Sequence, residues 1–250
     1  MSLFEDTNPK ALKELLAEIH SRTMALPDFQ RDFVWEPSAT QELIVSIANN
    51  YPAGSILRVR DEKRVFAARE FEGAPELNGK KHTFLVLDGQ QRLTSLYQAF
   101  FGVGEHRYYV DLKMLVDGAD FEEAVSHERA TTKRVKRRES FEYQAERLIL
   151  PLSVLQGGAG KFGQWTRRVA RRLADVERIK LEDALDGIEE QWIKTIDDYH
   201  FPVVTLSDQT KTDACGFRRL RPGNPIERGH AFRSKAATFS DEGDRAPLPA

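Results

Sequence analysis

One short polar segment carries residue types suited to phosphate chemistry. Asp88-Gly-Gln-Gln-Arg92 follows a β-branched, aromatic and apolar run, Thr83 to Leu87, and precedes a pattern of helical period. The run suits a buried strand, and the period suits a helix with one apolar face. The first turn of such a helix presents unpaired amide N–H groups and the positive end of the helix dipole. We therefore expect an anion site here, where Gln90, Gln91 and Arg92 add two amides and a forked guanidinium.

Two residues at the turn have expected backbone roles. Asp88 is a good N-cap, since its carboxylate can accept hydrogen bonds from free amides of the first turn. Gly89 allows a sharp turn and a close approach of backbone to a ligand. The same spacing also fits an ordinary strand, polar turn and helix of a protein core, because Asp-Gly turns are common.

A second polar pair lies in the segment from Met24 to Trp35. Pro27 rules out a regular helix there and favours an extended or turning path. Gln30 and Arg31 stand between large rings that would anchor the loop on a core, namely Phe29, Phe33 and Trp35. The alternative is a solvated Gln-Arg pair without a ligand.

The elements around these segments are short and mixed. Asn8-Pro9 would place Pro9 near the first turn of a helix over 11–20, and Pro37-Ser38 starts a second helix. Tyr51-Pro-Ala-Gly54 follows and leads into a strand over 55–59. Gly54 either lets the backbone approach a ligand or ends the preceding helix.

Three blocks follow one another along the chain: Pro27 to Trp35, Tyr51 to Leu57 and Leu87 to Thr94. Together, in this order, they resemble the N-terminal domain of GmrSD-type, modification-dependent restriction endonucleases. That resemblance implies an α+β fold, with a ParB/sulfiredoxin-like mixed core followed by a helical subdomain and a disordered C-terminal tail. It also implies a site for a nucleoside triphosphate and Mg²⁺. The expected catalytic residues are Asp88, Gln90, Gln91 and Arg92, with Asp88 also holding the metal. The expected nucleotide-binding residues are Gln30, Arg31, Gly54, Gly89 and Thr94.

The chain is expected to divide into three parts. We expect the core and nucleotide site in residues 1–112, a mainly helical extension with short strands in 113–207, and an irregular tail in 208–250. Within the extension, 121–142 reads as a charged loop or solvated face, 157–161 as a flexible connector, and 181–196 as one continuous buried helical stripe. The resemblance stops after Ser207, so a reading-frame slip or truncation is one hypothesis for the tail, and a genuine short variant is the other.

Basic residues gather at two places in the extension. Lys133 to Arg138 and Arg167 to Arg172 are usually read as solvated faces, and the alternative is a phosphate-contacting patch for DNA or RNA. The 250 residues carry a formal net charge of −2, so any nucleic-acid contact needs such a local patch.

Composition excludes several classes of protein. Cys215 is the only cysteine, which rules out an internal disulfide and a multi-cysteine zinc site. No signal peptide and no apolar run of membrane-spanning length is recognised, so a cytoplasmic protein without membrane contact is expected.

The predicted function is an NTP-binding and NTP-hydrolysing regulatory or sensor domain of a phage-defence restriction system that acts on modified DNA. The resemblance implies a partner nuclease domain or subunit of the HNH type. The six histidines show no metal-ligand spacing, which argues against a nuclease in this chain. The alternatives are a non-catalytic, nucleic-acid-binding ParB-like adaptor and a truncated, non-functional remnant.

Overall fold

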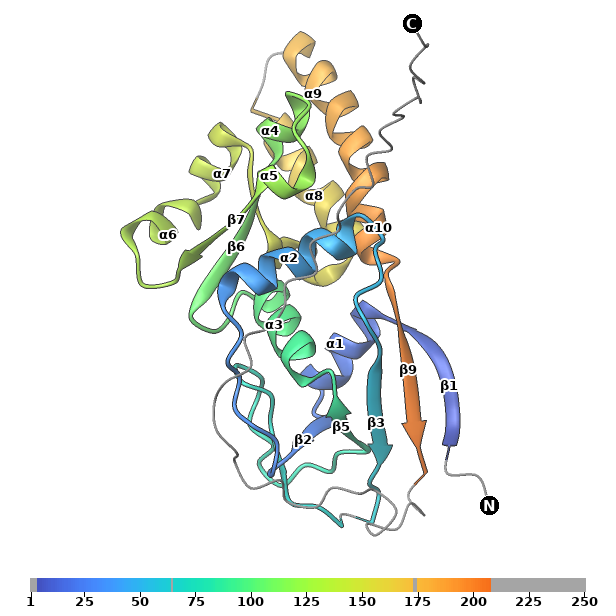
Figure 1. Cartoon of the computed structure of the whole chain (residues 1–250). Helices are drawn as coiled ribbons and strands as arrows, with labels where there is room; N and C mark the ends of the chain where they lie inside the picture. Colours follow the sequence, from blue (N-terminus) through green and yellow to red (C-terminus); the bar gives the residue numbers. More distant parts are fainter. Residues whose placement is uncertain (1–3, 64, 173–174, 208–250) are drawn as a thin grey trace, which may run out of the picture. The chain divides into compact units, whose positions relative to one another are not determined.

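A six-stranded mixed sheet carries the polar segments. The computed structural model describes residues 4–63, 65–172 and 175–207. The strand order is β1-β9-β3-β5-β2-β4, and the strands are β1 (Phe4–Ala11), β9 (His200–Leu206), β3 (Ile56–Arg60), β5 (Phe84–Asp88), β2 (Met24–Pro27) and β4 (Ala68–Arg69). β9 runs parallel to β3, and β2 runs parallel to β5, whereas the other neighbours are antiparallel. The last described strand therefore lies inside the sheet built by the first third of the chain (Figure 1).

Three amphipathic helices bury their apolar faces above this sheet: α1 (Leu12–His20), α2 (Pro37–Ala48) and α3 (Gln90–Phe101). α1 buries four residues at helical spacing, and α3 buries nearly its whole length. A helix buried on most sides belongs to the interior of a domain. α3 is thus held firmly, and so is its first turn.

A second, three-stranded antiparallel sheet has the order β7-β6-β8, formed by β7 (Val125–Arg129), β6 (His106–Asp111) and β8 (Ile149–Pro151). The short helices of this region are α4 (Leu112–Val116), α5 (Phe121–Ala124), α6 (Lys133–Arg138) and α7 (Phe141–Arg147). The charged run over 121–142 was expected to be a loop or solvated face. It instead contains an edge strand and two capped helices, with Thr132 and Ser140 accepting from first-turn amides.

The helical extension ends with a 3₁₀ turn, η1 (Leu152–Gly157), followed by α8 (Ala159–Ala170), α9 (Asp175–Ile188), a π-helical turn, η2 (Glu189–Ile193), and α10 (Lys194–Asp197). The expected connector over 157–161 is wrong, because Ala159 already lies in α8. The expected continuous stripe is interrupted as well. A π turn adds a residue to the helical repeat, so Ile193 is buried while Trp192 is only partly covered.

One continuous apolar cluster joins the two sheets and the helices, from Leu12 in α1 to Val203 in β9. The α+β fold class is therefore confirmed. Contacts within the described chain support one unit that reaches from the N-terminal strands through β9, and the sequence division at residue 112 does not separate two cores. The prediction for 208–250 lies outside the described residues.

Two local expectations fail for physical reasons. Pro9 does not start a helix but sits in edge strand β1 opposite Pro202, where a missing N–H is tolerated. Gly54 does not end α2, because Asn49 is the C-cap and Asn50 already takes a positive φ of 56°. None of the helices within the described ranges has the length and apolar character needed to cross a membrane.

Candidate functional site

The site begins where β5 passes into α3. Gly89 is the N-cap of α3 with a φ of 96°, in the left-handed region, and a Cβ there would overlap Cδ1 of Ile56. Only glycine fits this turn without strain. Asp88 was expected to be the cap, but it ends β5, and no side chain caps the helix. The first amides of α3 therefore have no partner within the helix and none from a capping side chain.

The two glutamines of the motif hold the loop from Gln30 to Trp35 by its backbone. Gln90 Nε2 donates to the carbonyl of Arg31 at 2.7 Å. Gln91 Nε2 donates to the carbonyl of Asp32 at 2.9 Å, and Gln91 Oε1 accepts from the amide of Val34 at 2.9 Å. Both glutamines are buried, so these bonds replace hydration that the side chains have lost. The start of α3 and the loop from Gln30 to Trp35 therefore meet through specific hydrogen bonds.

The loop is also tied back to the sheet. Gln30 Nε2 donates to the carbonyls of Val86 and Leu87 at 3.1 and 2.7 Å. Arg69, in β4, donates to the carbonyls of Gln30 and Arg31 at 3.2 and 2.9 Å. Sequence reasoning missed Arg69, because it lies in a charged stretch without periodicity and its partners are backbone atoms. The loop is consequently fixed along most of its length.

Arg92 has a different role from the one its charge suggests. Its guanidinium donates to the carbonyls of Ala53 and Ser55, both at 2.8 Å, and lies 3.4 Å from Asp88 Oδ2. Gly54 leaves room for the guanidinium, because a Cβ at that position would overlap Nη1. Arg92 thus fastens the segment around Gly54 to the first turn of α3. Gly54 contributes by leaving room for the Arg92 guanidinium.

A polar cavity of about 370 Å³ opens between the loop and the start of α3. Its lining combines residues of that loop with residues of the turn from β5 into α3: Gln30, Arg31, Trp35, Leu87, Asp88, Gly89, Gln90, Gln91 and Arg92. Arg31 is exposed, and its guanidinium has no hydrogen bond or ion pair with any residue that the structure describes. Asp88 is also accessible, with 72% of its side chain exposed. The cavity therefore offers one unpaired cation, one accessible carboxylate and the uncapped end of a helix.

The structure brings seven of the nine expected site residues to this cavity. Gly54 and Thr94 do not line it. Thr94 is fully buried, and its hydroxyl has no hydrogen-bond partner among the described residues. Trp35 was read only as an apolar anchor, yet it also forms part of the cavity wall.

The cavity offers few protein ligands for a metal ion. Within the described ranges, no cluster of three or more His, Cys, Asp or Glu side chains could hold a cation. A magnesium ion that arrives with a polyphosphate does not need such a cluster, because Mg²⁺ commonly keeps waters and takes one or two carboxylates plus phosphate oxygens. The Asp88 carboxylate fits that pattern.

Comparison with known proteins adds the family. Residues 12–216 match the family described as GmrSD restriction endonuclease, N-terminal domain. The match includes all three sequence blocks and runs past Ser207, where the resemblance was expected to stop. An uncharacterised protein of Methanocaldococcus jannaschii is 37% identical over 131 residues, which cover 47% of this chain and 22% of that protein.

Proposed function

Because this chain belongs to the family of GmrSD restriction endonuclease N-terminal domains, we propose that its polar cavity binds and hydrolyses a nucleoside triphosphate with Mg²⁺. The observation that carries the proposal is the lining itself. Two segments distant in sequence meet there, beside an uncapped helix N-terminus, and leave an arginine whose guanidinium pairs with no described residue. Backbone amides at a helix N-terminus bind phosphate groups, and a guanidinium matches phosphate oxygens bidentately.

The hydrogen bonds divide the roles among the motif residues. Arg31 and the first amides of α3 hold phosphate oxygens, whereas Arg92 is occupied by backbone carbonyls and positions the site. Both ends of the Gln91 amide are used by the loop. Gln90 donates through Nε2, but its Oε1 makes no hydrogen bond within the described chain. Gln90 is therefore the glutamine free to orient a water molecule, and Asp88 would supply the carboxylate for a Mg²⁺ ion that arrives with the nucleotide.

This activity would place the domain as a regulatory or sensor part of a phage-defence system that restricts modified DNA. The nuclease would reside in an HNH-type domain or partner subunit. Nucleotide binding at a helix that spans the centre of the domain offers a way to transmit the nucleotide state, since α3 contacts both the sheet and the helical extension.

Calorimetry with ATP, GTP and CTP in the presence of Mg²⁺ tests the proposal. We expect saturable binding of at least one nucleotide and a loss of about tenfold or more in affinity for Arg31→Ala, the usual size of a lost charged hydrogen bond. Arg31→Ala is preferable to a change at Arg92, because the Arg31 side chain makes no intramolecular bond with described residues that its loss would break.

Arg147→Ala is the matched control, since Arg147 is exposed and, among the described residues, forms an ion pair only with neighbouring Glu146. Asp88→Asn should bind nucleotide but hydrolyse it much more slowly. A folded wild-type protein that binds none of the three nucleotides would exclude the proposed site.

A further inference from the structure

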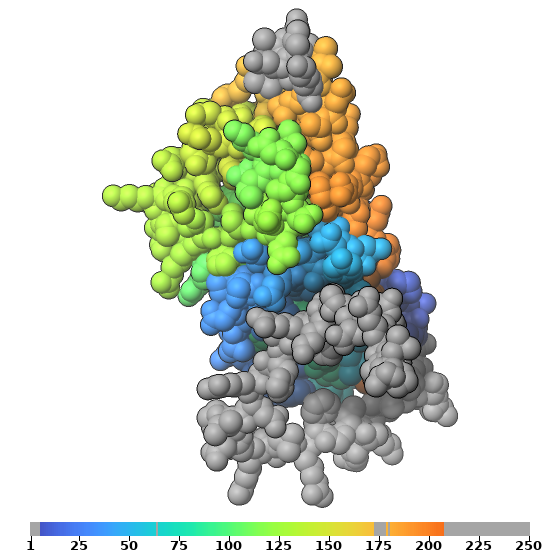
Figure 2. Space-filling view, turned by 45° about the horizontal axis from the view of Figure 1, so that its top comes forward, coloured from blue at the N-terminus to red at the C-terminus, as the bar shows by residue number. Residues whose placement is uncertain are grey.

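A basic surface lies on elements separate from the nucleotide cavity. We define the basic face as Lys133, Lys136 and Arg137 of α6 together with Arg167, Arg168 and Arg171 at the end of α8. All six side chains are exposed. None of the six forms an ion pair with the described part of the chain. Figure 2 shows the α6 and α7 surface at one side of the molecule, coloured yellow-green.

Acidic residues close to the basic face are already matched by other arginines. Glu128 pairs with Arg134 at 2.7 Å, and Glu142 pairs with Arg172 at 3.3 Å. The other two acids between residues 128 and 147 also have partners, at 4.0 Å for Glu139–Arg107 and 3.7 Å for Glu146–Arg147. The six cations therefore remain as a local positive excess on a chain whose formal net charge is −2. Such an excess attracts a polyanion to this surface.

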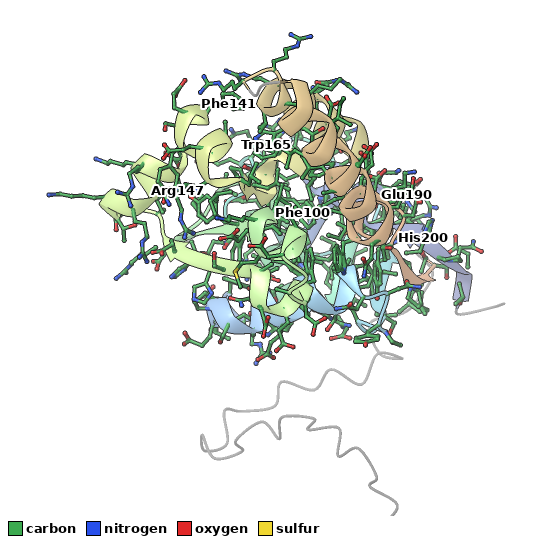
Figure 3. The ribbon with its side chains drawn as sticks, turned by 90° about the horizontal axis from the view of Figure 1, so that it is seen from above. Phe100, Phe141, Arg147, Trp165, Glu190 and His200 are labelled. Carbon is green, nitrogen blue, oxygen red and sulfur yellow. The ribbon has the colours of Figure 1, made fainter. Side chains whose placement is uncertain are left out.

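Aromatic rings of α7 link the two halves of the basic face. The Arg168 guanidinium lies 3.7 Å from the ring centre of Phe141, and that of Arg137 lies 4.9 Å from the ring centre of Tyr143. α7 thus stands between α6 and the end of α8. In Figure 3, Phe141 and Arg147 mark the two ends of α7, on the side of the molecule opposite His200.

The same contacts decide what the face can recognise. A guanidinium that stacks on a ring is held in place while its N–H groups still point outward to acceptors. Because guanidinium groups lie against these rings, Phe141 and Tyr143 serve as supports for the arginines. The N–H groups of these lysines and arginines suit phosphate oxygens as hydrogen-bond acceptors. Phosphate oxygens carry no information about the base sequence.

We propose that the basic face binds the phosphate backbone of duplex DNA without reading its base sequence. A duplex carries a dense row of phosphates, and the basic face carries its cations on two helices that both contact rings of α7. The proposal does not rest on nucleotide binding, because neither half of the face lines the cavity.

Fluorescence anisotropy with a labelled duplex of random sequence tests the proposal over a series of salt concentrations. Each lost phosphate contact should make the slope of log K against log salt shallower by about 0.9. We therefore expect Lys133→Gln/Lys136→Gln/Arg137→Gln and Arg167→Gln/Arg168→Gln/Arg171→Gln each to flatten the slope by about 2.7 when all three contacts are made. Glutamine keeps part of the methylene stem, so packing on the rings is largely retained.

The matched control is Lys80→Gln/Lys81→Gln/Lys113→Gln, which removes the same charge from exposed positions elsewhere. An equal loss of affinity in the control would overturn the proposal, because it would show a general charge effect. A strong preference between two unrelated duplexes of equal length would overturn backbone recognition. Binding of anionic vesicles or an acidic protein in place of DNA would also contradict the proposal. Calorimetry on the same variants keeps this result separate from nucleotide binding, which should be unchanged.

Discussion

The turn from β5 into α3, which borders the cavity, depends on the absence of a side chain at Gly89. Its φ of 96° places it in the left-handed region, and its Cα faces Ile56. A side chain at this point would strain the backbone and push against β3. The turn from β5 into α3, whose residues line the cavity, therefore requires glycine.

Gly89→Ala should lower the free energy of unfolding by roughly 1–3 kcal/mol through backbone strain, with a further loss from the clash. Gly79→Ala separates the two causes, because Gly79 also has a positive φ, 74°, but nothing lies within 4 Å of its Cβ position. Urea denaturation of both variants measures the difference. Equal losses would show that the contact with Ile56 has no effect.

Residue types predicted which residues meet at the cavity better than what each of them contacts. The sequence identified Arg31 and Asp88 as site residues, and both line the cavity. It also assigned Arg92 to phosphate, whereas the Arg92 guanidinium holds the carbonyls of Ala53 and Ser55. The carbonyls that engage an arginine belong to other segments of the chain, so spacing along the sequence cannot reveal this partner.

At the scale of elements, the segment between α2 and β3 is fixed from two sides. Arg92 holds it from α3, and Tyr199, just before β9, holds it from the other side. Tyr199 Oη donates to the carbonyl of Tyr51 at 2.8 Å and accepts from the amide of Ala53 at 2.9 Å. Tyr199 therefore supports the segment whose carbonyls accept hydrogen bonds from Arg92.

Tyr199→Phe should destabilise the protein by about 1–3 kcal/mol, since it leaves two backbone groups without their partner. Tyr51→Phe is the matched control, because it removes the same hydroxyl from a side chain that is 61% exposed. Thermal unfolding of both variants gives the comparison. A Tyr199→Phe variant as stable as the control would indicate that water replaces the lost bonds.

Elements with a clear hydrophobic period could be predicted from the sequence, whereas strands that depend on pairing with a neighbouring strand could not. The apolar stripes of α1, α2 and α3 and the central strand β5 are visible in the sequence. β1 and β7 are not, because their residues are largely polar and each strand exists through its neighbour, β9 or β6. Sheet order is likewise inaccessible, since nothing local indicates that β9 inserts between β1 and β3.

At the scale of the whole molecule, the small sheet and α2 meet around two histidines. The rings of His106 and His127 meet edge to face with their centres 5.9 Å apart, and His127 Nδ1 is 2.8 Å from Gln41 Oε1 of α2. Desolvation first, and then the nearby His127, lowers the pKa of His106 below its ordinary value of 6.5. Glu105 and Glu36 act in the opposite direction, and Arg129 adds to the lowering. The fold therefore favours the neutral form of His106.

This preference predicts the direction of the pH dependence of stability. Between the lowered pKa of the folded state and about 6.5, the unfolded chain binds more protons at His106 than the folded protein does. The stabilising contribution is thus fully present above about pH 6.5 and is lost as the pH falls through that value towards the folded pKa. We expect the free energy of unfolding to decrease from pH 7.5 to 5.5, and His106→Gln to show a smaller decrease. NMR titration of the His106 ring gives an independent reading, and a midpoint at or above 6.5 would contradict the proposed cause.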